Sequence, residues 1–153
     1  TLKTFIIKSD SQKYAIPVSS VKYVKKIKPE DIYIREGRQC ILFENHSVPV
    51  YYLNSVLGGG IEIFKNAKFY TIVIIENQEK QAAYVTEQLL GDQEIFYKKL
   101  IPPIMKIKNI SGFTTLASGE ICLIINPYDL IRNTVLDISQ NVVEIKQIGA
   151  WNK

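Results

Sequence analysis

His46 is the one histidine in the chain, and it lies in the polar run Glu44–Ser47 between two apolar, strand-like segments. Histidine is the side chain most often used as a general base near neutral pH, and a Ser–His–carboxylate site requires it to face a nucleophile across a pocket. The sequence places no nucleophile in such a relation to His46. We therefore expect a surface histidine in a turn, and no catalytic triad.

Two pairs of carboxylates are close enough in sequence to suggest general acid–base chemistry, namely Asp92 with Glu94 and Glu87 with Asp92. That chemistry needs burial or a neighbouring charge to keep one carboxyl protonated. No nearby residue supplies this environment, so we expect a solvated turn. The glycine run Gly58–Gly60 lacks the Lys-Ser/Thr of a phosphate-binding loop and opens no long helix, which favours a hinge.

The two cysteines, Cys40 and Cys122, each lie in an apolar, strand-like run. They are too few for a disulfide framework, and two buried thiols are the simpler expectation. A structural zinc site takes about four Cys or His ligands. The chain cannot supply that number of ligands, so the sequence predicts no metal. Together with the interpretations of His46, the carboxylates and the glycine run given above, it also predicts no catalytic residue and no cofactor.

The formal net charge is +4, and much of the excess comes from the lysines of Val21–Lys28. In an extended strand, Lys22, Lys26 and Lys28 share one face and apolar residues occupy the other, which is an amphipathic strand. Three interpretations of the basic face remain open: a solvated surface, an acidic protein partner, or nucleic acid, which has the weakest support.

Tyrosines on a small barrel could stack on the bases of single-stranded nucleic acid. The tyrosines that suggest this, Tyr14, Tyr23, Tyr51 and Tyr70, lie in alternating strands, where packing in the core explains them. We therefore expect no nucleic-acid partner.

The longest apolar runs, such as Tyr70–Ile75 and Ile121–Ile125, are too short to cross a bilayer. A basic segment followed by a long apolar stretch, as in a signal peptide, is absent from the sequence. We expect no direct insertion into a membrane. Because the first residue is Thr1 rather than Met, we expect the chain to be part of a longer protein.

Short strand-like runs bounded by turn residues dominate the chain, and their spacing favours small closed sheets. The two halves also echo each other. Lys13–Val21 is similar to Lys80–Gln88, and Val48–Leu57 is similar to Cys122–Ile131. In the second echo, a buried strand runs into a short helix in both halves. These echoes predict duplicated, barrel-like subdomains.

A longer motif begins at Val85-Thr86-Glu87 and continues through Gly91-Asp92-Gln93-Glu94-Ile95 to Lys99-Leu100. Pro102-Pro103 and the run N-I-S-G-F-T-T-L-A-S-G-E from Asn109 follow. This order resembles the CheW-like regulatory domain of chemotaxis histidine kinases of the CheA family, especially those that carry a receiver domain after it. The resemblance covers residues 1–132. Glu87 replaces the usual Asp, and Phe113 replaces a small residue.

The resemblance implies an all-β, CheW-like fold of two small five-stranded, SH3-like β-barrels with short helices. We expect the first barrel over residues 14–66 and the second over 67–126. A strand over 4–9 and a closing helix over 127–132 would pack across them. Residues 133–153 would form a linker or an appended element.

The resemblance also implies the function of a regulatory scaffold. Such a domain binds the CheW adaptor and the cytoplasmic tips of chemoreceptors, and it couples them to a kinase domain in cis within cytoplasmic receptor arrays at the inner membrane. It is not itself an enzyme. The first barrel is expected to contact the adaptor, and a receptor helix to lie in a groove at Val21, Tyr23, Glu44 and Thr71, although Val21 and Tyr23 could equally be core residues. A free-standing CheW-type adaptor is the alternative, and a nucleic-acid-binding barrel is a distant third.

Overall fold

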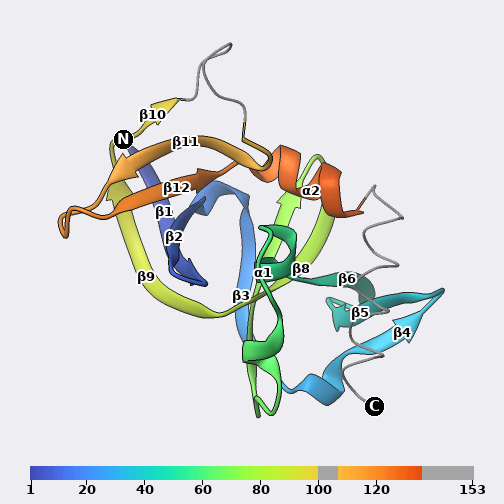
Figure 1. Ribbon diagram of the computed structural model, residues 1–153. Helices are drawn as coiled ribbons and strands as arrows, with labels where there is room; N and C mark the ends of the chain where they lie inside the picture. Colours follow the sequence, from blue (N-terminus) through green and yellow to red (C-terminus); the bar gives the residue numbers. More distant parts are fainter. Residues whose placement is uncertain (100–106, 136–153) are drawn as a thin grey trace.

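The computed structural model describes residues 1–99 and 107–135, which form strands joined by tight turns and a few short helices (Figure 1). The strands are β1 (Leu2–Ser9), β2 (Gln12–Pro17), β3 (Val21–Ile27), β4 (Tyr33–Arg35), β5 (Arg38–Phe43), β6 (His46–Tyr52), β7 (Tyr70–Asn77), β8 (Lys80–Thr86), β9 (Gln88–Ile95), β10 (Lys98–Lys99), β11 (Ile110–Thr115) and β12 (Ile121–Ile125). The helices are η1 (Val18–Ser20), η2 (Pro29–Asp31), η3 (Glu62–Phe64), α1 (Leu53–Val56) and α2 (Pro127–Val135). The expected all-β fold class is confirmed.

Within the described residues the strands form two six-stranded sheets. One has the order β10-β11-β12-β2-β1-β9, and we call it the terminal sheet because its strands come from both ends of the chain. The other has the order β3-β7-β8-β6-β5-β4 and is called the central sheet. Each has one strand more than expected. The short strands β10 and β4 lie at the edges of their sheets and account for the difference.

The two sheets are built in the same way by an exchange between two halves of the chain. When β1–β6 are matched with β7–β12, the order β9-β1-β2-β12-β11-β10 becomes β3-β7-β8-β6-β5-β4. Each half therefore gives its first hairpin to the sheet of the other half. The expected barrel limits of 14–66 and 67–126 are wrong for this reason, because β1 and β2 pair with strands of the second half, and β7 and β8 pair with strands of the first.

The repeat predicted from the sequence echoes is confirmed by the pairing of the echoed strands. The strands β2 and β8 belong to the first echo, and β12 and β6 belong to the second. β2 pairs in parallel with β12, and β8 pairs in parallel with β6. In both cases the partner strand runs on into a helix, α2 or α1. The echoes therefore mark equivalent positions in the two sheets.

A shared core lies between the sheets, and each sheet also encloses a core of its own. Side chains alternate between faces along a strand, and β7 shows the result. Its residues Ile72 and Ile74 enter the core of the central sheet, whereas Val73 and Ile75 enter the shared core. The terminal sheet contributes Ile7 and Ile16 to the same shared core, and it encloses one smaller cluster of its own. Strands buried on both faces explain the continuous apolar runs in the sequence.

Helix α2 covers the shared core and runs to Val135, three residues beyond the expected closing helix over 127–132. It begins where the Asn126 Oδ1 atom accepts a hydrogen bond from the Asp129 amide at 3.2 Å, a helix-capping contact. Its inner face places Leu130 in the shared core, fully buried. The Thr134 hydroxyl bonds to the Tyr84 hydroxyl at 2.6 Å, which ties the helix to β8. Residues 136–153 lie outside the described residues, as does most of the expected extension over 133–153.

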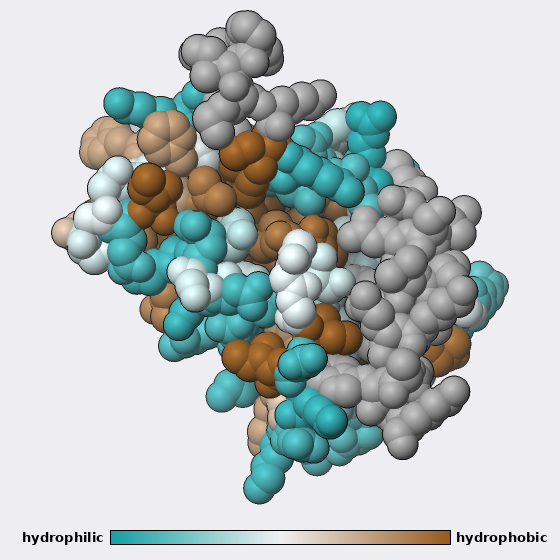
Figure 2. All heavy atoms as spheres, viewed as in Figure 1, coloured by the Kyte–Doolittle hydropathy of each residue, from teal (hydrophilic) through white to brown (hydrophobic). Residues whose placement is uncertain are grey.

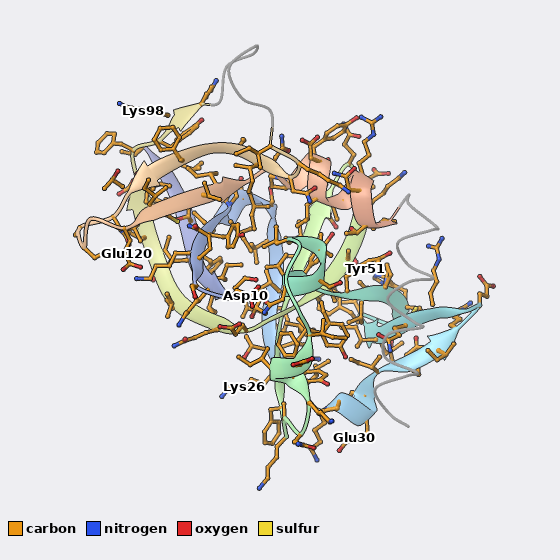
Figure 3. All side chains as sticks on the ribbon, in the orientation of Figure 1. Asp10, Lys26, Glu30, Tyr51, Lys98 and Glu120 are labelled. Carbon is orange, nitrogen blue, oxygen red and sulfur yellow. The ribbon has the colours of Figure 1, made fainter. Side chains whose placement is uncertain are left out.

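Two glycine positions are explained by the close approach of another segment. Gly112 lies inside β11, where the backbone of β10 passes so close that a Cβ atom would lie 2.3 Å from the Lys98 carbonyl oxygen. In the run expected to be a hinge, Gly59 packs against the Asp10 carboxylate, and a Cβ there would lie 1.9 Å from Asp10 Oδ2. Figure 3 shows Asp10 beside α1, at the junction of the two sheets. Close backbone approach is a common reason for glycine in such places.

Candidate interaction surface on the central sheet

Val21 and Tyr23 begin β3, and a β-bulge between them sends their side chains in different directions. Val21 lies opposite Ile75 of β7, and Tyr23 lies opposite Ile74. Without the bulge, residues two apart would share a face; the extra residue on β3 breaks that rule. Val21 is therefore half-buried against the shared core, as one of the open interpretations held. The Tyr23 side chain is 51% exposed.

The Tyr23 ring packs against Phe43 at the end of β5. The ring centroids are 5.7 Å apart, with an angle of 35° between the rings. Phe43 in turn packs against the core of the central sheet and meets the His46 ring edge-on at 6.3 Å. An exposed aromatic ring supported by a second ring is a typical anchor for protein–protein contact, because it offers apolar area at little cost in side-chain entropy.

Glu44 lies next to this aromatic cluster, in the turn between β5 and β6. Glu44 and Asn45 both have positive φ angles, 48° and 65°. Two such residues in succession are typical of the tight turn that matches the twist of a β-hairpin. The turn holds the Glu44 carboxylate in solvent at the same end of the central sheet as Tyr23. The structure therefore brings these two predicted residues into one neighbourhood.

Thr71 lies elsewhere on the same sheet. It faces Lys26 of β3 and Thr86 of β8, and its carbonyl oxygen accepts a hydrogen bond from the Thr86 hydroxyl at 3.1 Å. Val21 pairs with Ile75, which is four residues after Thr71 on β7. At about 3.3 Å per residue, Thr71 and Val21 are therefore about 13 Å apart along the strand. Alternation puts Thr71 on the face of the shared core, opposite to the face that carries Tyr23.

Three residues of this surface were not among the predicted site residues: Phe43, His46 and Gln81. The two ring nitrogens of His46 lie 3.1 Å from the Glu44 carbonyl oxygen and 2.9 Å from Gln81 Oε1. Gln81 comes from β8, so the contact joins the β5–β6 hairpin to the neighbouring strand. His46 is exposed, as expected, but it is the first residue of β6 rather than part of the turn. The sequence offered no signal for its bond to Gln81, which depends on the parallel pairing of β6 with β8.

A basic strip runs along β3 beside this surface. Lys22, Lys26 and Lys28 are exposed, and Lys25 is half-buried. Figure 3 shows Lys26 pointing away from the sheet, with Glu30 of η2 at the same end of the molecule. By its pairing with Thr71, Lys26 lies on the opposite face of β3 from Tyr23, so the strip and the aromatic cluster do not form one continuous face.

The other groups that could do chemistry have structural partners. Asp92 and Glu94 lie in β9 opposite Phe5 and Lys3 of β1, and not in the turn that was expected. Burial raises the pKa of the Cys122 thiol to about 11, and burial is also the main cause of the raised pKa of Cys40. The described residues contain no group of three or more His, Cys, Asp or Glu side chains that could hold a metal ion.

The Glu87 carboxylate fastens the β1–β2 turn to α1. Its Oε1 atom accepts hydrogen bonds from the Asp10 amide at 3.1 Å and from Asn54 Nδ2 at 3.0 Å.

Among the residues that the structure describes, no helix is long and apolar enough to cross a membrane. The face shown in Figure 2 mixes hydrophilic and apolar side chains, with an apolar group where β9, β10 and β11 meet in Figure 1. Phe96 is the most exposed apolar side chain of that region, at 80%.

Residues 3–135 match the family described as the CheW-like domain. The chain belongs to this family. Over 131 residues it is 34% identical to the chemotaxis protein CheA of Bacillus subtilis strain 168, and the match covers 85% of this chain and 19% of that protein. It is 23% identical to the sensor histidine kinase CheAY of Helicobacter pylori over 82% of this chain and 15% of the relative. The chain thus spans less than a fifth of the length of these relatives.

A solved structure has the same fold as this CheW-like domain. The scaffolding protein TtCheW from Thermoanaerobacter tengcongensis superimposes with a TM-score of 0.64 at 19% sequence identity. The superposition covers 82% of this chain and 88% of that protein. The CheW fold expected from the sequence resemblance is therefore confirmed.

Proposed function

We propose that this CheW-like domain is the regulatory scaffold of a chemotaxis histidine kinase, and that it binds a CheW adaptor and chemoreceptor tips. The observation that carries the proposal is the 34% identity to a CheA protein over 131 residues. By contrast, identity to the free-standing scaffolding protein of the same fold is 19%. The domain itself supplies no catalysis. The kinase reaction would belong to an ATP-binding domain in the same protein, with a receiver domain following.

We place receptor contact on the central sheet, around Tyr23 and Glu44, with Val21 and Thr71 as further groove residues, and adaptor contact on the same strands of the first half. Tyr23 is exposed and supported by Phe43, so its ring is available and already ordered. Ordering before binding reduces the entropy that association costs. The proposal also places the parent protein in receptor arrays at the inner membrane, with neither nucleic acid nor membrane lipid as a direct partner.

A free-standing adaptor is the second candidate, favoured by the superposition that covers 88% of TtCheW. The two candidates differ in what the gene encodes. An ATP-binding domain encoded upstream of Thr1 would establish the kinase, whereas a start codon just upstream would establish the adaptor.

The binding proposal is tested by titrating the chain with the CheW adaptor of the same organism, using calorimetry and NMR chemical-shift mapping. We expect shifts to concentrate on β3 and the β5–β6 turn. Tyr23→Ala should weaken binding by about tenfold or more, as expected for an aromatic anchor worth about 1.4 kcal/mol. Tyr128→Ala is the matched control, because Tyr128 is an exposed tyrosine on α2 at 44%. Equal losses for both variants, or shifts confined to the terminal sheet, would contradict the proposed surface.

A further inference from the structure

Both ring nitrogens of His46 face oxygen atoms. One lies 3.1 Å from the backbone carbonyl oxygen of Glu44 and the other lies 2.9 Å from Gln81 Oε1. A carbonyl oxygen can only accept a hydrogen bond. A neutral imidazole has one N–H, so it satisfies one of these two contacts and sets a lone pair against an oxygen in the other. Only the imidazolium form, with two N–H groups, makes both bonds.

The Gln81 amide is held so that it offers its oxygen to His46. Its nitrogen donates to Glu76 Oε2 of β7 at 2.6 Å. Turning the amide over would give His46 a donor, but it would also place the amide oxygen against the Glu76 carboxylate. Because a carboxylate only accepts, Glu76 fixes Gln81, and Gln81 in turn requires a proton on the facing nitrogen of His46. His46, Gln81 and Glu76 thus form a hydrogen-bonded chain across the three strands β6, β8 and β7.

The charged groups around His46 favour the same protonation state. Hydrogen bonding to Gln81 is the main cause of the raised pKa of His46, followed by the bond to the Glu44 carbonyl oxygen; the Glu44 charge adds to them, and desolvation opposes them. Glu76 of β7 acts on His46 only through its hydrogen bond with Gln81. On β8, Lys80 neighbours Gln81 and so points to the opposite face. On β3, Lys25 shares the face of Tyr23 and is the cation of that strand that could oppose protonation.

His46, at one end of this hydrogen-bonded chain, lies beside the Phe43–Tyr23 pair of the candidate surface. The His46 ring meets Phe43 edge-on at 6.3 Å, and Phe43 supports the exposed Tyr23 ring at 5.7 Å. We propose that protonation of His46 locks the β5–β6 hairpin onto β8 and thereby orders the Phe43–Tyr23 pair, so that the interaction surface of this domain is sensitive to pH. The binding part of this inference depends on the proposed function, whereas the locking of the hairpin does not.

The direction follows from the sign of the shift. A pKa that is raised on folding means that the lock is fully present below the ordinary histidine value of 6.5 and is lost as pH rises through the folded-state value. The ordered surface is therefore the low-pH form. Binding through Tyr23 should weaken as the pH is raised from 6 to 8.

The test is an NMR pH titration of the whole chain, in which His46 is the one histidine signal. We expect His46 to titrate above the value of the same residue in the chain unfolded in urea, with the ring signals of Phe43 and Tyr23 following the same midpoint. Glu76→Gln should lower the His46 midpoint, because a glutamine at position 76 lets the Gln81 amide turn. Glu79→Gln is the matched control, since it removes the same charge from the exposed β7–β8 turn.

A second measurement reads the binding of the CheW adaptor at pH 6 and pH 8. The unsubstituted chain should bind several-fold more weakly at pH 8, and His46→Gln should lose the part of that dependence that belongs to this chain. The inference is overturned if His46 titrates at its unfolded value, or if Glu76→Gln and Glu79→Gln change the His46 midpoint equally. It is also overturned if the ring signals of Phe43 and Tyr23 do not change with the titration of His46. Absence of adaptor binding at both pH values would instead count against the proposed function, and the NMR titration would still decide the lock.

Discussion

Leu130 on α2 provides a quantitative test of the shared core. Its side chain is fully buried in the shared core. Leu130→Ala removes three carbon atoms, which at about 0.8 kcal/mol each gives about 2.4 kcal/mol of lost transfer free energy. The cavity adds to this, so we expect a total of about 3–5 kcal/mol in the free energy of unfolding. That is a large part of the total stability of about 5–15 kcal/mol typical of a domain.

The assay is urea unfolding followed by far-UV circular dichroism. With a slope of about 1–3 kcal/mol per molar urea, the loss should lower the midpoint by one molar or more. Tyr128→Ala serves as the control, because Tyr128 is two residues away on the same helix and exposed. If the two variants had similar midpoints, α2 would not be packed on the sheets as described, and the argument for a shared core would be refuted.

Two further predictions concern backbone approach and thiol chemistry. Gly112→Ala should detach β10 from β11 and destabilise the chain by at least about 1–3 kcal/mol, as overpacking does, whereas Gly60→Ala should be tolerated because no atom lies within 4 Å of its Cβ position; equal urea midpoints would contradict this. Burial raises the pKa of Cys122 from 9.0 to about 11, so its thiol should resist a maleimide at pH 8 until urea unfolds the chain. Because this pKa is raised in the folded state, the contribution of Cys122 to stability should fall as pH rises between these two values; rapid labelling of the native chain would contradict the buried position.

Much of the fold was predictable because strand signals and the two echoes are local features. The run Tyr70–Ile75 is apolar at every position except Thr71, which is typical of a strand buried on both faces. The exchange of hairpins was not predictable from local patterns. Nothing in Lys13–Val18 tells that this strand pairs with β12 from the other end of the chain as well as with its neighbour β1. A register that depends on long-range pairing carries no short-range signal.

The candidate surface shows the same division. Tyr23 and Glu44 were predicted from the family resemblance and lie at the same end of the central sheet. Phe43 was not predicted as a site residue. Its position at the end of a strand, directly before the turn at Glu44 and Asn45, leaves it half-buried. The bond from His46 to Gln81 joins residues far apart in sequence and depends on the parallel pairing of β6 with β8. The bulge that separates Val21 from Tyr23 is one extra residue in a regular pattern, and the sequence does not mark it.

The exchange of hairpins also sets the order in which a growing chain can fold. The central sheet needs only residues Val21–Thr86, so all its strands are available before β9–β12 are made. Within this domain the hairpin of β1 and β2 is synthesised first, but its partners β9 and β12 are synthesised only after the strands of the central sheet. During synthesis it presents unpaired strand edges, which are prone to association with other chains. A chain terminated before Ile121 would keep a complete central sheet and leave this hairpin without its parallel partner β12.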